Sequence, residues 1–436
     1  MAGAYDDHQY SGTAHYVREG AGGTADGSDW TNAWPSMPAS FVRGDTYYIA
    51  DGSYGAATFS QADDGVLWIN IKKAYIYDHG TETGWDASYG DGKAVFPSVV
   101  FSSSYWEMNG NTGSRRTGYG FEIAIETSSV VSASSISHIT LRYCNVHQYA
   151  EGTTRAQLAA GNQHHLLDFN ATTNITFSHL YLHHVKGCQF FFHLNDTVVV
   201  EYCWISENCS TAIDHAEGMS DNGSDNVTIR YNKWCDIDGT AFIACINGPA
   251  NSAATNWDVY GNVFWHTGTF GCGVSAVITV AEDATNFVHA VNWNVFNNTV
   301  YMVNGWFHFN FNSSSTSGVV VENNLIYQNR SDNSYTNYGT IGFGADGSYD
   351  YNYYGLCAFP YAFSNAAHEN TIYDGPNCRL SDAVGFPGFV DAANGDFHLL
   401  GPIAGYTGFT LAAPYDHDMD GVQRGSSGAW TRGAYE

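Results

Sequence analysis

A strand-and-turn segment returns eight times along this chain, and this repetition limits the possible folds more than any other feature. The segments read "ITLRYCNVHQY", "ITFSHLYLHHV", "VVVEYCWISEN", "VTIRYNKWCDI", "WDVYGNVFWHT", "VFNNTVYMVNG", "VVVENNLIYQN" and "YDYNYYGL". One aligned column holds Cys144, Leu180, Cys203, Asn232, Asn262, Asn298, Asn324 and Asn352, and a column two residues later holds Val146, Leu182, Ile205, Trp234, Phe264, Val300, Ile326 and Tyr354. Internal repeats of about 20 to 50 residues are typical of solenoids.

Each repeat consists of strands and turns. Short apolar runs rich in Val, Ile, Tyr and Phe alternate with clusters of Gly, Asn, Ser and Asp, and helical periodicity is nearly absent. One repeat cannot bury its apolar side alone, so we expect successive coils to stack in parallel around a shared core. The five consecutive asparagines would then lie at one turn and bond from coil to coil. The sequence predicts an all-β fold, a single-stranded parallel β-helix with N-terminal and C-terminal capping segments.

With these columns, the chain resembles the right-handed parallel β-helix proteins of the pectate-lyase-like superfamily. The stretch "GDTYYIADGSY" (44–54) resembles the first strand of such helices, and residues 388–436 resemble their C-terminal closing segment. The resemblance covers nearly the whole chain and implies the fold, which hosts lyases, hydrolases, epimerases, tailspikes and adhesins. The catalytic motif of any one family is not matched residue by residue.

We expect one domain over residues 1–436. Residues 1–60 should form the N-terminal cap and first strand, residues 61–356 the coils with long loops, and residues 357–436 the closing segment, because an uncovered terminal coil would leave an open sheet edge. The N-terminus lacks a charged and apolar signal, and nowhere do about 18 apolar residues run together. We therefore expect no membrane insertion, and an extracellular protein whose signal peptide is absent from this sequence.

The composition limits the partners. Lysine and arginine total 16 and aspartate and glutamate 43, for a net charge of -27. Such a charge disfavours nucleic acid and anionic membranes as partners, and a polyanionic substrate would need a local basic patch or a metal ion. Aromatic residues make up 15 % of the chain, and flat rings with a polar tip suit sugar faces. The odd count of nine cysteines leaves the redox compartment open.

A second strand is expected after each repeat, at 164–170, 190–195, 212–217, 242–247 and 307–312. In the expected register the inward residues are Phe169, Leu194, Ala216 and Ile246. The two outward rows are then Asp168, His193, His215 and Cys245, and Asn170, Asn195, Glu217 and Asn247. Because coils lie about 4.8 Å apart, the polar residues of these rows would form one patch; the alternative is an ordinary solvated ladder. A further column, on an undetermined face, holds Gln148, His184, Glu207, Asp236 and His266.

The predicted patch consists of Asp168, His193, His215 and Glu217, and it has the groups that β-elimination needs. A histidine beside a carboxylate keeps one tautomer, gains basicity and can remove the C5 proton of a uronate. We predict His215 as the base and His193 as its partner or the acid. Asp168 would orient the base, and Glu217 would hold charge or a metal ion.

The carboxylate of the uronate must also be neutralised. The candidates are a divalent cation, such as Ca²⁺ held by Asp168 and Glu217, or the side chains of Lys186 and Arg230. The remaining predicted substrate-binding residues are Asn195, Asn247 and Trp265.

The sequence favours an extracellular enzyme that depolymerises a polysaccharide, with a lyase acting by β-elimination as the leading hypothesis. A glycoside hydrolase is one alternative, because Asp214, Glu217, Asp236 and Asp238 supply nearby carboxylates for such a reaction. The other alternative is a non-catalytic adhesin or phage tailspike-like glycan-binding protein. The oligomeric state is not determined by the sequence, and a trimer is compatible with the tailspike alternative.

Overall fold

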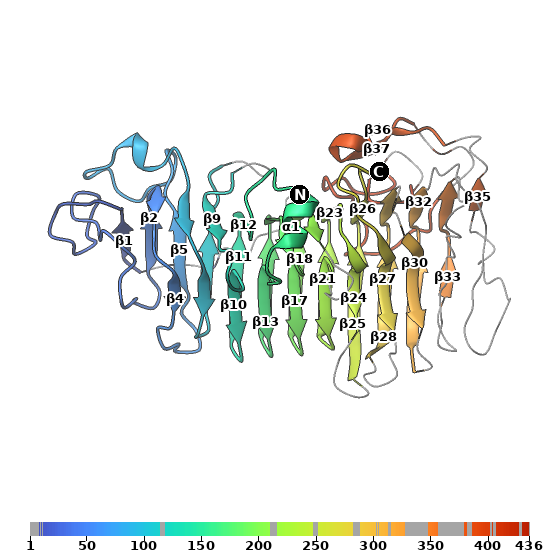
Figure 1. Cartoon of the computed structure of the whole chain (residues 1–436), viewed down its shortest axis with the longest axis horizontal. Coiled ribbons are helices and arrows are strands. Elements are labelled where there is room, and N and C mark those ends of the chain that lie inside the picture. The colour runs from blue at the N-terminus through green and yellow to red at the C-terminus, as the bar shows by residue number, and fades with distance from the viewer. Residues whose placement is uncertain are drawn as a thin grey trace.

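The structure, a computed structural model, describes residues 8, 10, 12–113, 118–209, 216–246, 252–281, 288–301, 303, 305–312, 315–327, 348–355, 379–381, 386–401, 403, 407–426 and 430–435. The chain winds through three long sheets of parallel strands, here called A, B and C, and each complete coil adds one strand to each sheet (Figure 1). The predicted parallel stacking of coils is therefore confirmed.

The strands are grouped here by sheet. Sheet A comprises β1 (Ala14–Val17), β2 (Thr46–Ile49), β5 (Ile69–Lys73), β8 (Trp106–Asn109), β11 (Ser137–Arg142), β14 (Thr173–Ser178), β18 (Asp196–Glu201), β22 (Asp225–Arg230), β25 (Ser252–Tyr260), β28 (Val288–Phe296), β31 (Ser317–Glu322) and β33 (Ser348–Asp350). Sheet B comprises β3 (Gly52–Ser53), β6 (Ala94–Phe96), β9 (Phe121–Ala124), β12 (Cys144–His147), β15 (Tyr181–His183), β19 (Trp204–Ser206), β23 (Lys233–Cys235), β26 (Val263–Trp265), β29 (Thr299–Tyr301), β32 (Leu325–Tyr327), β34 (Tyr353–Gly355) and β35 (Arg379–Ser381). Sheet C comprises β4 (Ala57–Phe59), β7 (Val99–Phe101), β10 (Val131–Ser134), β13 (Leu167–Asn170), β17 (Phe190–His193), β21 (Met219–Asn222), β24 (Gly239–Cys245), β27 (Val274–Ala281) and β30 (Gly305–Asn312).

The loops between sheets B and C carry further short elements. The strands β16 (Val185–Lys186) and β20 (Asn208–Cys209) pair there in parallel, and the helix α1 (Arg155–Ala160) packs against them. A capping box at Thr154 starts α1, since its hydroxyl accepts from the Gln157 amide and the Gln157 side chain bonds back to the Thr154 amide. The remaining elements are η1 (Ala87–Tyr89), β36 (Phe389–Asp391), η2 (Ala392–Asn394) and β37 (Asp396–Leu399).

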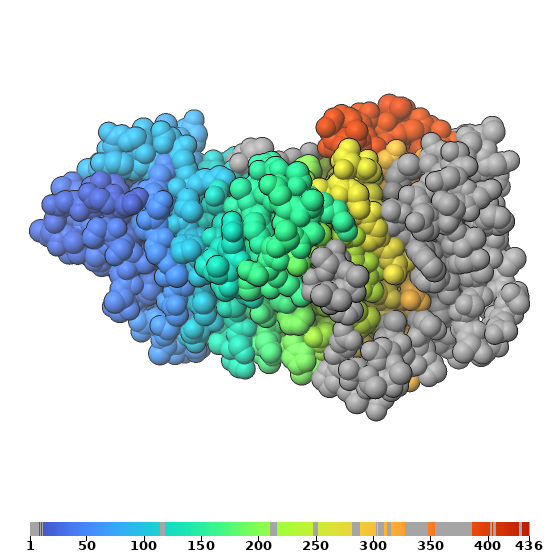
Figure 2. All heavy atoms as spheres, in the orientation of Figure 1, coloured from blue at the N-terminus to red at the C-terminus, as the bar shows by residue number. Residues whose placement is uncertain are grey.

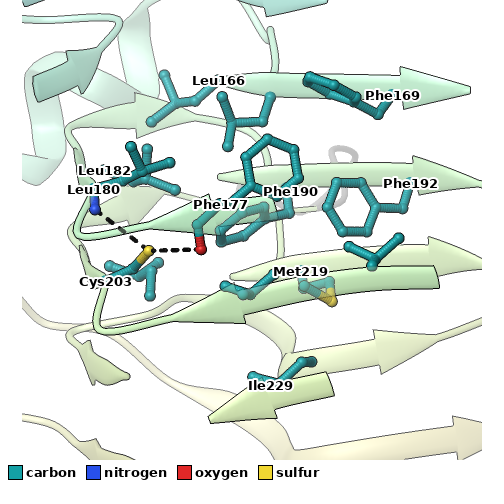
Figure 3. Packing of buried hydrophobic residues seen from close by; sticks show 14 of the residues in the cluster. Leu166, Phe169, Phe177, Leu180, Leu182, Phe190, Phe192, Cys203, Met219 and Ile229 are labelled. Atoms are coloured by element: carbon teal, nitrogen blue, oxygen red, sulfur yellow. Dashed lines mark hydrogen bonds between the residues drawn. The ribbon is translucent and has the colours of Figure 1, made fainter. Parts of the chain in front are cut away.

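The core fills the space that the three sheets enclose. The predicted apolar column is in register from Val146 to Tyr354, and its residues up to Ile326 are buried. Figure 3 shows the rings of Phe177, Phe190 and Phe192 packed between neighbouring coils. Burying one such side chain contributes about 1.5–3 kcal/mol.

The predicted asparagine ladder is present at the turn between sheets A and B. From Asn262 onward, the side-chain oxygen of each ladder asparagine accepts a hydrogen bond from the backbone amide of the preceding asparagine. Asn232 N donates to Asn262 Oδ1 at 3.0 Å, and Asn262 N donates to Asn298 Oδ1 at 3.0 Å. Each side-chain nitrogen also donates to a strand carbonyl, as Asn262 Nδ2 does to Ile229 O at 2.8 Å. Cys203 enters the same column, and its amide donates to Asn232 Oδ1 at 2.9 Å. The ladder therefore holds consecutive coils in one register.

Two segments pack on the outside of the coils: the first contacts Tyr48 and Lys72 of sheet A through Asp78, and the second lies on sheet B. Residues 75–92 form an excursion after β5, tied back by a hydrogen bond from Asp51 N to Tyr89 O. The C-terminal segment packs Phe389 and Phe397 on the rings of Trp265 and Tyr301, so it covers the side of the later coils (Figure 1).

We expect Asn262→Ala to lower the free energy of unfolding by about 2–4 kcal/mol, because the Asn232 amide and the Ile229 carbonyl each lose a buried partner. Chemical denaturation followed by circular dichroism measures the change. Asn394→Ala is the matched control, since Asn394 is exposed and bonds only to Asp391 in η2, and it should change stability by less than about 0.5 kcal/mol. Equal effects of the two substitutions would contradict a structural role for the ladder.

Candidate functional site

Sheet B has a stretch in the middle of the molecule whose outward side chains range from the exposed Trp204 to the buried His147 and His183. Figure 2 shows the outline dipping between the excursion at 75–92 and the C-terminal segment at 386–401. The strands beneath this dip present polar and aromatic side chains outward. We call the outward residues of β6, β9, β12, β15 and β19 the open floor: Val95, Glu122, Asn145, His147, Tyr181, His183, Trp204 and Ser206.

The N-terminal part of the open floor holds three charged or titratable groups in contact. Lys93 Nζ lies 2.7 Å from Glu122 Oε2, and Glu122 Oε1 lies 3.6 Å from His147 Nε2. The nearby His147 ring, and then the Lys93 ammonium, lower the pKa of Glu122 to about 2. Glu122 is therefore ionised at neutral pH, and it would stabilise a positive charge on the His147 ring.

The next two coils add two adjacent histidines and a carboxylate. The ring of His147 stacks on that of His183 at 4.8 Å, and His183 Nδ1 lies 2.7 Å from His184 Nδ1. His184 Nδ1 lies 3.2 Å from Glu207 Oε2, and His183 Nε2 lies 2.8 Å from Asn145 Oδ1. A continuous line of contacts therefore runs over five successive coils, from Lys93 to Glu207.

Burial sets the protonation of this second group. It lowers the pKa of His183 to about 2 and that of His184 to about 4, because a charged ring is poorly solvated there. It also raises the pKa of Glu207, to which the neighbouring Asp236 adds. Both imidazoles are neutral at physiological pH and offer lone pairs to a proton or a metal ion.

The turns explain why these side chains meet. His184, Glu207 and Asp236 have left-handed backbone conformations, with φ of 50°, 55° and 51°. They follow β15, β19 and β23 at the same position of successive coils, so their side chains stack. The predicted column from Gln148 to His266 is thus confirmed, and it lies at the edge of the open floor.

The patch predicted on sheet C is wrong in its register. The structure pairs Asp168 with Phe191 and Asn170 with His193, two residues away from the predicted pairing of Asp168 with His193. Leu194, predicted to point inward, is exposed in the turn after β17, where its φ is 52°. The physical reason is that the phenylalanines at 190 and 192 already fill the inward positions.

The third strand of the predicted patch also lies elsewhere. The strand that pairs with β17 is Met219–Asn222, whereas the sequence predicted it at 212–217. Asp221 occupies an inward position beside Phe192 and Cys245, which the sequence pattern disfavours. Its carboxylate accepts from the Gly223 and Ser224 amides at 2.9 Å each, and these turn bonds decide the register.

The four predicted catalytic residues are therefore not one compact patch. His193 lies near the far end of its strand, whereas Asp168 and Glu217 both lie near His165. Burial lowers the pKa of His165, and the charges of Asp168 and Glu217 oppose this lowering. Asp168 accepts from Ser129 Oγ at 3.2 Å, and the buried Glu217 accepts from Cys188 Sγ at 3.3 Å. His215 lies outside the described residues, so its predicted role as the base stays a prediction.

The predicted substrate-binding residues are dispersed over the molecule. Asn195 is buried in a turn, where its side chain bonds to Thr172 and Phe169, and Arg230 forms an ion pair of 2.7 Å with Glu201 on sheet A. Trp265 is buried beneath Phe397. Lys186 donates to Gly161 O at 2.9 Å and so ties the loop after α1, while Asn247 lies outside the described residues.

The sequence reasoning missed Lys93, Glu122, His147 and His183 as site residues. These residues come from four strands or strand ends of sheet B. Only Glu122 has a clear signal, an outward position between two inward apolar residues in "FEI", whereas His147 and His183 each follow a single inward apolar residue. Exposed aromatic rings accompany them: Trp204 is 38 % exposed and has Lys233 Nζ 5.9 Å from its ring centroid.

Sheets A, B and C, wound by one chain with a ladder at one turn, define a right-handed parallel β-helix. The predicted parallel β-helix is therefore confirmed, and this fold is consistent with the predicted resemblance to the pectate-lyase-like superfamily. The structure is similar to that of pectate lyase Pel9A, with a TM-score of 0.53 and 14 % identity, over 97 % of this chain and 96 % of that chain. It is also similar to a rhamnogalacturonan lyase, with a TM-score of 0.50 and 12 % identity, over 87 % of this chain and 92 % of that one.

At these identities the likeness concerns the fold. A scan against protein-family models and a search of curated proteins found no match. Among the described residues, none of the helices has the length and apolar character needed to cross a membrane.

Asp221 generates a prediction about pH. Burial raises the pKa of Asp221 from 3.8 to about 6. Between pH 3.8 and about pH 6 the native state therefore binds more protons than the unfolded state, so the free energy of unfolding falls as the pH rises. We expect Asp221→Asn to leave stability nearly unchanged at pH 4 and to raise the free energy of unfolding by on the order of 2 kcal/mol at pH 7. Denaturation at both pH values measures this.

The control for this prediction is Asp64→Asn. Hydrogen bonds from the Leu67 and Val66 amides lower the pKa of the exposed Asp64, so its contribution has the opposite sign and is present at neutral pH. A stabilising effect of Asp64→Asn, or no pH dependence of the Asp221→Asn effect, would contradict the assignment.

Proposed function

We propose that this protein is a polysaccharide lyase that cleaves a uronate-containing chain by β-elimination on the open floor. Two lyases share the fold, which supports the reaction class. The observation that carries the proposal is the contact series Lys93–Glu122–His147 beside exposed aromatic rings. An extracellular location is part of the proposal, because a polymeric substrate does not enter cells readily.

His147 is the proposed base. It would remove the C5 proton of the uronate, and the ionised Glu122 would stabilise the imidazolium that forms. The Lys93 ammonium, whose side chain is 43 % exposed, would face the uronate carboxylate and make the C5 proton more acidic. The electron pair left on C5 then forms the C4–C5 double bond and expels the glycosidic oxygen from C4, and this oxygen takes a proton from water.

The aromatic side chains of the floor suit the sugar rings. Tyr181 stacks with Tyr119 at 5.9 Å and lies edge-on to Trp204 at 6.2 Å, so the rings form a continuous apolar strip. Sugar rings present C–H faces that pack on such strips, while Lys233 beside Trp204 supplies a charge for a uronate.

The structure offers less to the alternative functions. A hydrolase needs two carboxylates that act on one bond. Glu207 and Asp236 are neighbours, but both oxygens of Asp236 accept from Thr267, at 2.8 and 2.6 Å. A non-catalytic glycan binder would need the aromatic strip but not the His147–Glu122 pair.

Calcium held by Asp168 and Glu217 stays a prediction. A calcium ion takes oxygen ligands, whereas the described neighbours of these carboxylates include the His165 ring and the Cys188 thiol. No step of the proposed reaction passes through such an ion.

The test is incubation with a panel of acidic and neutral polysaccharides, with and without EDTA. A lyase forms unsaturated products that absorb in the ultraviolet, a hydrolase forms only new reducing ends, and a binding protein forms neither.

We expect His147→Gln to reduce kcat about a hundredfold or more with an unchanged fold, because the base is lost. Lys93→Gln should act in the same direction.

Variants of the sheet C face provide the control. His193→Gln and Asp168→Asn should keep activity within about threefold, since neither residue contacts the open floor in the structure. Loss of activity in these variants and not in His147→Gln would move the catalytic site to sheet C.

Substrate binding is tested separately through Trp204. We expect Trp204→Ala to raise KM about tenfold with kcat nearly unchanged, because one sugar ring loses its stacking partner. A tenfold loss of affinity corresponds to about 1.4 kcal/mol, which is the order of magnitude of one ring contact. Phe409→Ala is the control, since Phe409 is 45 % exposed and lies in the C-terminal segment. A similar rise in KM for both variants would argue against the aromatic strip.

A further inference from the structure

We infer that His183 Nδ1, His184 Nδ1 and Glu207 Oε2 form a binding site for one divalent first-row transition-metal ion of the Zn²⁺ type. These three atoms all lie within 4.8 Å of one another. The two nitrogens are 2.7 Å apart, and the oxygen is 3.2 Å from His184 Nδ1. This site is distinct from the pair His147–Glu122, and metal binding by it does not depend on the proposed reaction.

The neighbours of the three ligands orient them as a metal site requires. His183 Nε2 donates to Asn145 Oδ1 at 2.8 Å, which leaves the lone pair of the neutral ring on Nδ1. Ser206 Oγ donates to Glu207 Oε2 at 3.3 Å. Metal-binding histidines commonly donate a hydrogen bond from their second ring nitrogen in this way, because the bond fixes both the tautomer and the orientation of the ring.

The local backbone brings the ligands together without long flexible connections. His183 ends β15, and His184 follows it with a φ of 50°, so that two adjacent rings turn toward one another. Glu207 occupies the equivalent turn position of the next coil with a φ of 55°. Two coils held in register by parallel hydrogen bonds therefore position all three ligands.

The proton between the two rings marks the place of the ion. Since His183 Nδ1 accepts, His184 Nδ1 must donate the single proton that lies in the 2.7 Å contact. A bound ion would replace this proton, which would move through water to Nε2 of the same ring, so that His184 stays a neutral imidazole. Bonds of about 2.0–2.1 Å in a tetrahedron place the two nitrogens about 3.3 Å apart, so the rings need to separate by only about 0.6 Å.

The donor set selects the kind of ion. Two imidazole nitrogens and one carboxylate oxygen suit Zn²⁺ and its neighbours, and they do not suit Ca²⁺ or Mg²⁺, which take oxygen ligands. Both histidines are buried, whereas the side chain of Glu207 is 29 % exposed. Three protein ligands leave the fourth position for water or a substrate oxygen, and it would be reached from the Glu207 side.

Metal binding by the full-length protein tests the inference directly. After dialysis against a chelator, the protein is titrated with Zn²⁺ in a calorimeter, and with Co²⁺ while visible absorption is recorded. We expect one ion per chain, and a loss of affinity of about a hundredfold or more in Glu207→Gln and His184→Gln. Asn145→Ala should weaken binding by about 10- to 100-fold, because His183 loses its orienting partner.

His147→Gln separates this inference from the proposed function. It removes the proposed base but leaves the three ligands, so it should bind the metal ion with the affinity of the wild type. Circular dichroism confirms the fold of each variant, and the near-isosteric Glu207→Gln serves if a histidine variant does not fold. Absence of saturable binding by the wild type, or wild-type affinity in both Glu207→Gln and His184→Gln, would overturn the site, whatever the protein does to polysaccharides.

Discussion

The hydrogen bond between one coil and the next is the interaction on which the rest of this molecule depends. It runs through the backbone of three parallel sheets and through the side chains of the asparagine ladder. Because every coil is paired with its neighbours, a residue that recurs at one position of the coil forms a row along the molecule. Rows pointing inward build the core, and rows pointing outward decide which chemical groups meet on the surface.

The open floor results from this geometry. Neighbouring coils place six side chains in one line of contacts, although they come from five separate parts of the sequence. These side chains are Lys93, Glu122, His147, His183, His184 and Glu207. Farther along, the outward side of the same sheet is covered by Phe389 and Phe397. His147 lies next to the more exposed side chains of Lys93 and Glu122 and fits acid–base chemistry, whereas the neutral imidazoles at the other end of the line fit a metal ion.

Sequence reasoning succeeded where one periodic signal and one physical requirement coincided. This holds for the columns from Cys144 and Val146 onward and for the turn column through His184 and Glu207. In both, a buried strand is joined to a short turn, and a shift of the strand register by one residue would expose the core. It failed on sheet C, where the loops before each strand vary in length and an aspartate, Asp221, replaces an expected apolar residue. The predicted patch of Asp168, His193, His215 and Glu217 rested on that register.

The sequence by itself determined the class of fold, the asparagine ladder and the rows that follow it, because these depend on residues that repeat from coil to coil. Only the tertiary structure decided which outward rows are exposed and which ionisable groups touch. Those features depend on where the excursion at 75–92 and the C-terminal segment pack, and on how deeply each histidine is buried. Neither depends on a repeating pattern, so the sequence carries no periodic signal for them.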